Sequence, residues 1–289
     1  MVDGDVNPVC EPTHEESLSA GGVALHVEHF CPAVPARLVL VTVHGFGAHC
    51  GIYRHVAGAL VARGIAVTQF DCRGHGRSQG RRGHVDRFDD YHDDLCLVVR
   101  RARERTPGVP WALMGHSLGG AIVLDHVLRQ QSQPQADRLV AVAPWLELKM
   151  KVSVPKRAAA DFFSRLKPTL TTGNGIKAED VSRSHEVVAN FFRDPLVHHV
   201  ATAGWFASVL RTQAALRTMA GQLAVPTLLL VAGRDRIVST EAALAFAQAA
   251  GSAVEVRRYQ DLYHEIFLEP ERERVLSDVA NWLLQPQAR

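Results

Sequence analysis

A serine set between glycines is the first candidate for catalysis. The segment Gly115-His116-Ser117-Leu118-Gly119 matches the pattern G-x-S-x-G, between residues patterned as a strand and as a helix. A sharp turn from a strand into a helix crowds the backbone, so glycines two positions before and after the serine remove Cβ atoms that would clash. The pattern predicts a nucleophilic Ser117 hydroxyl exposed at the start of a helix. A glycine-rich turn with a capping serine is the alternative.

A serine hydroxyl needs a histidine to remove its proton and a carboxylate to orient that histidine. At a turn of this kind the chain order is serine, acid, histidine. Among the histidines after Ser117, only His264 lies in a loop after the last predicted strand. Asp235 follows the preceding strand and is the candidate acid, with Asp261 and Glu147 as competitors.

The attacked carbonyl becomes an oxyanion, which needs N–H donors already in place. The backbone N–H of Leu118 is one candidate donor. The N–H of Phe46 is the other, because His44-Gly45-Phe46-Gly47 follows the first long predicted strand and its glycines permit a tight turn. His44 precedes the nucleophile in the chain, which favours a structural role over that of the base.

These residues depend on a repeating order of buried strands and amphipathic helices. A hairpin is predicted near 17–27, further strands over 37–43, 65–70, 111–114, 139–142, 227–232 and 254–259, and helices over 53–63, 88–105, 118–129, 240–250 and 271–284. Continuous apolar strands joined by helices indicate an α/β fold, with a mostly parallel sheet covered by helices on both faces. Functional residues then belong at the carboxyl ends of the strands.

The chain divides into a core and an insertion. Residues 1–16 contain two prolines and no apolar periodicity, which predicts a flexible tail, whereas 17–144 and 224–289 form the predicted core. Residues 145–223 are helical in pattern and are predicted to form an inserted cap, with a flexible stretch at 171–175. Its aromatic residues are candidates for the acyl pocket, although about half could serve only to hold the cap together.

Composition excludes several classes of function. The 289 residues are 47% hydrophobic and 21% charged, as in ordinary globular proteins, and the formal net charge is only +2. The arginines of 73–87 alternate with aspartates, which favours an ion-paired loop over a nucleic-acid site. The acidic N-terminus and the short apolar runs disfavour a targeting peptide or a membrane span, so a cytoplasmic location is expected.

Cysteine and histidine usage predicts neither a metal nor another cofactor. The five cysteines lie in the first third of the chain without a CxxC pair or a spacing that pairs them with histidines, which predicts reduced thiols. Cys50 follows residues 44–47, the candidate oxyanion segment, and could lie near the site. Tyr91-His92-Asp93-Asp94 is no metal motif, because neighbouring residues on a helix point in different directions.

Together these segments resemble the α/β-hydrolases, and within them the monoacylglycerol lipase and lysophospholipase branch. The narrower resemblance rests first on residues 71–80, which look like that branch's D-x-R-G-H-G-x-S-x-G segment. It also rests on five shorter matches: 44–47, 115–120, 233–238, 263–265 and Arg193-Asp194-Pro195-Leu196. It implies a serine ester hydrolase that forms an acyl-Ser117 intermediate on esters with an apolar acyl chain. Transient contact with a membrane surface through the cap is also expected.

Two alternatives stay open. The same catalytic residues could cleave amides, thioesters or C–C bonds or carry out perhydrolysis, and a protein of this fold could bind a ligand without catalysis. Serine at position 117 disfavours epoxide hydrolase and haloalkane dehalogenase chemistry, which needs a carboxylate nucleophile in such folds.

Overall fold

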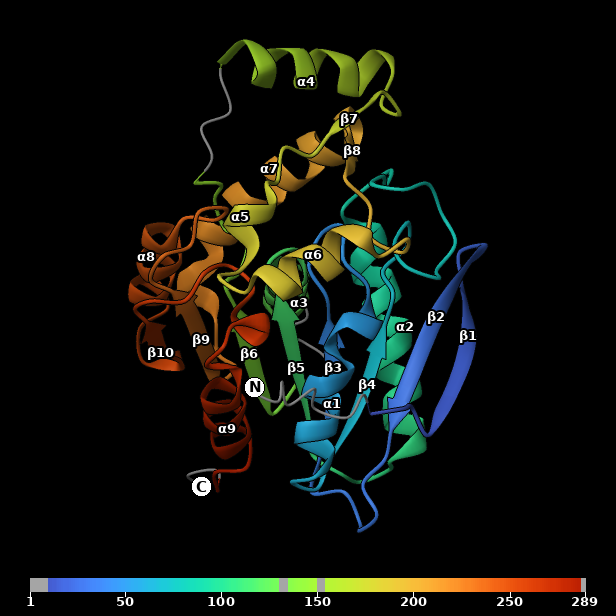
Figure 1. The fold of residues 1–289 in the computed structure, drawn as a ribbon, viewed down its shortest axis with the longest axis vertical. Coiled ribbons are helices and arrows are strands. Elements are labelled where there is room, and N and C mark those ends of the chain that lie inside the picture. The colour runs from blue at the N-terminus through green and yellow to red at the C-terminus, as the bar shows by residue number, and fades with distance from the viewer. Residues whose placement is uncertain (1–9, 130–134, 150–153, 287–289) are drawn as a thin grey trace.

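An eight-stranded sheet forms the centre of the computed structural model, which describes residues 10–129, 135–149 and 154–286 (Figure 1). The strand order is β1-β2-β4-β3-β5-β6-β9-β10. The bounds are β1 His14–Ala20, β2 Val23–Phe30, β3 Leu38–Val43, β4 Ile65–Phe70, β5 Trp111–His116, β6 Arg138–Val142, β9 Thr227–Ala232 and β10 Val254–Tyr259. The neighbours β4, β3, β5, β6, β9 and β10 pair in parallel. Strand β2 pairs antiparallel with both β4 and β1, which forms the edge.

Helices cover both faces of this sheet. They are α1 Arg54–Val61, α2 Asp89–Arg105, α3 Leu118–Arg129, α8 Thr240–Ala250 and α9 Arg272–Leu283, with 3-10 turns η1 Cys50–Tyr53, η2 Ala220–Gln222, η3 Gly251–Ala253 and η4 Ile266–Leu268. In Figure 1, α1 and α9 pack together on one face, and α2 and α3 on the other. Every residue of β4, β5, β6 and β9 is buried. The predicted α/β fold with a mostly parallel sheet is therefore confirmed.

The insertion between β6 and β9 lies beyond the carboxyl ends of the central strands (Figure 1). It contains α4 Val154–Leu166, β7 Thr171–Gly173, α5 Ala178–Val181, α6 His185–Arg193, β8 Val200–Thr202 and α7 Ala203–Met219. The prediction of a flexible stretch at 171–175 was wrong for its first three residues. They form β7, which pairs antiparallel with β8, and the N–H of Asn174 donates to the carbonyl of His199 at 2.9 Å.

The predicted boundary of the N-terminal tail was also wrong, because β1 begins at His14. Residues 1–9 lie outside the described residues. An edge strand needs no apolar periodicity when backbone pairing and ion pairs hold it. Here Glu16 pairs with Val27 across the strands and its carboxylate accepts from Arg101 at 2.9 Å, while Glu15 lies 3.1 Å from Arg54.

Of the helices in the described part of the chain, none is both long enough and apolar enough to cross a membrane.

Candidate active site

The turn between β5 and α3 has the crowding that its glycines predict. Ser117 has a φ of 53°, in the left-handed region that favours glycine. A Cβ on Gly115 would lie 2.2 Å from the carbonyl oxygen of Gly119, and one on Gly119 would lie 2.1 Å from that of Val43. Glycines at these two positions therefore let the chain place Ser117 at the carboxyl edge of the sheet.

The structure brings Asp235 and His264 together. The Nδ1–H of His264 donates to Oδ2 of Asp235 at 2.8 Å, so Nε2 is the ring nitrogen left to face a substrate or Ser117. The other oxygen of Asp235 accepts from the backbone N–H groups of Ile237 and Val238 at 2.8 and 2.9 Å. All four hydrogen-bonding groups are buried, which makes the carboxylate a fixed, well-oriented acceptor.

The competing acids lie elsewhere. Asp261 is exposed and pairs with Arg234 at 3.0 Å, and Glu147 is exposed and lies 3.3 Å from Arg217. No hydrogen bond joins either carboxylate to His264 within the described residues.

Burial and mutual charge shift the two pKa values in opposite directions. Burial alone would raise the pKa of Asp235, but the charge of His264, its hydrogen bond and the two backbone donors outweigh burial and lower that pKa. For His264, burial favours the neutral ring, yet the Asp235 carboxylate outweighs it and raises the pKa above its ordinary value of 6.5. The pair therefore favours a charged imidazolium, the form that arises when His264 takes a proton.

The segment 44–47 lies directly against the turn. A Cβ on Gly45 would come within 3.4 Å of the Ser117 Cβ and 3.0 Å of His116 Nδ1. Leu118 is the first residue of α3, so its N–H has no carbonyl partner earlier in the helix. Gly45, the residue before the predicted donor Phe46, and Leu118, the other predicted donor, thus both lie next to the serine.

His44 is structural, as predicted. Its Nδ1–H donates to the carbonyl of Gly45 at 2.7 Å, and its Nε2 accepts from the N–H of Cys72 at 3.0 Å. Accepting at Nε2 requires a neutral ring, and burial indeed lowers the pKa of His44. The side chain fixes the oxyanion segment to the loop that follows β4.

Asp71 explains why the segment 71–80 accompanies the site. Its two carboxylate oxygens accept from the N–H groups of Cys50 and Arg77 at 2.7 and 2.6 Å, and its carbonyl accepts from the Ser78 hydroxyl at 2.6 Å. Gly76 has a φ of 49°, and a Cβ there would collide with the Asp71 carboxylate at 2.1 Å. In the same loop, Arg73 is ion-paired with Asp94 at 2.6 Å. The loop therefore stabilises the backbone around the oxyanion segment through hydrogen bonds.

Three buried residues beside the site were missed by the sequence reasoning. The hydroxyl of Tyr53 donates to Glu265 at 2.9 Å, and Nε2–H of His116 donates to the carbonyl of His264 at 3.0 Å. Glu265 and His116 are the chain neighbours of His264 and Ser117, which is the one signal that could have singled them out. This network fixes the backbone of the histidine loop to the serine turn.

A single cavity of about 630 Å³ joins the core residues to the insertion. Ser117, His264, Gly45 and Phe46 line it from the core. The insertion adds mainly apolar side chains, including the aromatic residues Trp145, Phe163, Phe191, Phe192, Trp205 and Phe206. Phe46 stacks on Trp205 with ring centroids 3.7 Å apart. The size and lining suit a ligand with a long apolar part.

Cys50 does not line this cavity. It is buried beneath the oxyanion segment, and burial raises the pKa of its thiol well above the usual range, so it is no nucleophile. None of the five cysteines forms a disulfide.

Comparison with known proteins decides the family. The model of the family described as Serine aminopeptidase, S33 (Hydrolase_4) matches residues 34–271. The chain belongs to this family. A monoacylglycerol lipase of Mycolicibacterium smegmatis is 34% identical over 91% of the chain and 94% of its own length. The phospholipase YtpA of Bacillus subtilis is 29% identical over 82% of the chain and 91% of its length.

Solved structures agree with the fold expected of an S33-family member. The crystal structure of a monoacylglycerol lipase from Paleococcus ferrophilus superposes with a TM-score of 0.82 at 28% identity, covering 90% of this chain and 98% of that one. The resemblance to the monoacylglycerol lipase branch of the α/β-hydrolases is therefore confirmed.

The raised pKa of His264 predicts the pH profile of this S33-family site. A general base must be neutral, so kcat/KM for a nitrophenyl ester should rise through an acid limb that lies above pH 6.5. Asp235→Asn removes the charge that raises this pKa, so the limb should move to lower pH while kcat falls by up to about 10⁴. Asp261→Asn is the matched control, and a limb that moves in this control instead would identify Asp261 as the acid.

Proposed function

We propose that this protein is a serine hydrolase of the monoacylglycerol lipase type, which cleaves esters of long apolar acyl chains with Ser117 as nucleophile, His264 as base and Asp235 as the orienting acid. The observation that carries the proposal is that Ser117 and His264 open into one apolar cavity of about 630 Å³. Monoacylglycerols are the preferred substrates and lysophospholipids the second class, in line with the names of the two relatives.

The proposed reaction has two halves, acylation of Ser117 and hydrolysis of the acyl-serine. His264 Nε2 takes the hydroxyl proton as the Ser117 oxygen attacks the ester carbonyl carbon, and the N–H groups of Phe46 and Leu118 stabilise the oxyanion. When the C–O bond breaks, the imidazolium returns its proton to the leaving alcohol. Water then repeats the sequence on the acyl-serine, releasing the fatty acid and restoring the free hydroxyl.

The lining of the cavity favours ester over aminopeptidase substrates, although the family is named for a serine aminopeptidase. An aminopeptidase site needs a carboxylate for the substrate's ammonium group. Glu265 is the acidic residue among the described residues that line the cavity, and it is buried and already accepts from Tyr53 at 2.9 Å. Polar contacts for an alcohol or headgroup are present instead: Asn174 and the buried Nε1–H of Trp145, which has no hydrogen-bond partner in the described chain.

The insertion is proposed to act as the cap and as the surface that meets lipid. On α4, Phe162 and Leu166 are 58% and 68% exposed, whereas Ala160 and Phe163 of the same helix line the cavity. An apolar exposed side next to the cavity lets an acyl chain pass from a membrane into the site without crossing water. A cytoplasmic location stays a prediction from the sequence.

A substrate panel tests the function. The wild-type enzyme should hydrolyse monoacylglycerols with kcat/KM rising about three- to fourfold per methylene until the cavity is full, because each buried CH₂ contributes about 0.8 kcal/mol. Ser117→Ala should lower kcat by about 10⁴ or more and abolish fluorophosphonate labelling. Faster turnover of matched amides or thioesters would select the alternative chemistry, and an unlabelled wild-type protein would identify a ligand-binding protein.

Two changes at Phe46 separate its backbone from its ring. Phe46→Pro deletes the N–H and should lower kcat by about 10² to 10³ even for a small acetate ester. Phe46→Ala keeps the donor but removes the ring stacked on Trp205, so it should raise KM for long-chain esters with little change in kcat for the acetate ester. Equal, small effects on kcat in both folded variants would place the second donor elsewhere.

The exposed residues of α4 predict lipid binding. The double variant Phe162→Ser/Leu166→Ser should lose about tenfold or more of its partitioning onto phosphatidylcholine vesicles, measured by co-sedimentation, because two large apolar groups no longer leave water. Turnover of a water-soluble ester should be unchanged. Val34→Ser, at a residue that is 61% exposed before the amino end of β3, is the matched control. Equal binding by all three proteins would contradict the proposed contact.

A further inference from the structure

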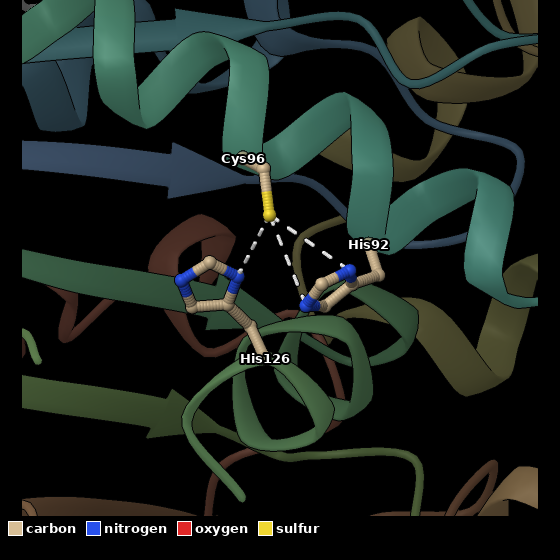
Figure 2. Close-up of side chains that lie close together, drawn as sticks. All are labelled: His92, Cys96 and His126. Carbon is tan, nitrogen blue, oxygen red and sulfur yellow. Dashed lines mark hydrogen bonds between the residues drawn. The ribbon is translucent and has the colours of Figure 1, made fainter. Parts of the chain in front are cut away.

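Three potential metal ligands meet between α2 and α3. Figure 2 shows Cys96 and His92 on one helix pointing toward His126 on the other. The Sγ of Cys96 lies 3.8 Å from Nδ1 of His126 and 3.8 Å from each ring nitrogen of His92. One donor atom from each residue lies within 4.8 Å of the other two.

These distances match a tetrahedral metal site that needs little rearrangement. With a zinc–sulfur bond of about 2.3 Å and zinc–nitrogen bonds of about 2.0–2.1 Å, tetrahedral geometry separates sulfur from nitrogen by about 3.6 Å. The observed 3.8 Å is close to that edge. His92 and Cys96 are four residues apart, so both side chains lie on one face of α2, and His126 approaches that face from α3.

Charges around the cluster also favour a cation. The Asp93 carboxylate lies 3.6 Å from His92 Nδ1 and adds negative charge beside the cluster. Asp125, next to His126, is buried, and its Oδ2 has no hydrogen-bond partner within the described residues, while its Oδ1 accepts from Arg129 at 2.8 Å.

We propose that His92, Cys96 and His126 bind one Zn²⁺ ion, which joins α2 to α3. Sulfur and imidazole nitrogen are the donors that zinc prefers, and the thiol releases its proton to solvent as the S–Zn bond forms, without any oxidation. The fourth position is open to water, because His92 and Cys96 are only partly buried.

The site is separate from the catalytic residues. His126 follows Ser117 by nine residues on α3, which is about 13–14 Å along the helix axis, and none of the three ligands lines the cavity. The proposed metal is therefore structural and takes no part in ester cleavage. The prediction that no cysteine is spaced to pair with a histidine was wrong, because His92 and Cys96 are four residues apart on α2. The third residue, His126, comes from another helix, and no local pattern reports it.

A second group of potential ligands carries no such proposal. His26, Glu28 and Cys50 also lie close together, but the Glu28 carboxylate already binds Arg54 at 2.6 Å and Gln69 at 2.7 Å. A second cation beside the Arg54 guanidinium would be repelled.

Cobalt substitution tests the proposal on the purified full chain. The protein is first treated with a chelator and then titrated with Co²⁺. A thiolate-to-cobalt charge-transfer band and the intense visible bands of tetrahedral cobalt should appear and should saturate at one equivalent of Co²⁺ per chain. One equivalent of Zn²⁺ should abolish these bands. Zn²⁺ should also raise the Tm, because a ligand that binds only the folded state stabilises it.

Variants distinguish this site from adventitious binding. Cys96→Ser should remove the charge-transfer band, and Cys96→Ser and His126→Gln should each weaken zinc binding by at least about 100-fold, since even loss of an outer contact costs about 10- to 100-fold. Cys31→Ser, at an exposed cysteine, is the matched control and should bind like the wild type. Circular dichroism and fluorophosphonate labelling check folding without depending on metal. Absence of the band in the wild type, or its persistence in Cys96→Ser, would overturn the proposal.

Discussion

The structure depends on one strained turn. Ser117 holds a φ of 53°, which is unfavourable for a residue with a side chain, and the turn closes only because Gly115 and Gly119 leave room for backbone oxygens at about 2 Å from where their Cβ atoms would be. The strain persists because β5 and α3 are buried on both sides of the turn. Since β3 lies beside β5, the same crowding sets the oxyanion segment against the serine, and the order of β6, β9 and β10 brings Asp235 and His264 from the other side.

Once the turn is fixed, the remaining requirement is to keep charged groups buried without losing their hydrogen bonds. Asp235 meets it with two backbone N–H donors and His264, and Glu265 meets it with Tyr53. An unpaired carboxylate at either position would carry a large desolvation cost. The insertion completes the environment by lining the cavity with aromatic rings, and the low polarity there strengthens the hydrogen bonds that act on the reacting ester.

The sequence predicted what short-range patterns encode and missed what distant contacts create. Apolar runs predicted the buried central strands β3, β4, β5, β6 and β9, and the glycine spacing predicted the crowded turn at Ser117, because those signals lie within a few residues of one another. The contact of Tyr53 with Glu265 spans 212 residues, and no local pattern reports it. The start of β1 at His14 was missed because that edge strand depends on pairing with β2 and on ion pairs. Strand β7 was missed because its partners in β8 lie 27 to 31 residues later, from Gly173 with Val200 to Thr171 with Thr202.

Helix α3 links the turn at Ser117 to the proposed zinc site. Its first turn supplies the Leu118 N–H, every residue from Leu118 to Leu128 is buried, and its C-terminal part carries Asp125 and His126 toward α2. The sheet packs against one side of α3, and α2 packs against another side. Between α2 and α3 lies the polar and partly exposed cluster of His92, Cys96 and His126. Tilting a rigid helix at one end displaces its other end. Contacts near the C-terminal end of α3 therefore help to keep its first residues in place at the strained turn. A metal between α2 and α3 would add a bond between the two helices to the apolar packing that already joins them. Such an ion would act on the structure and would take no part in ester cleavage.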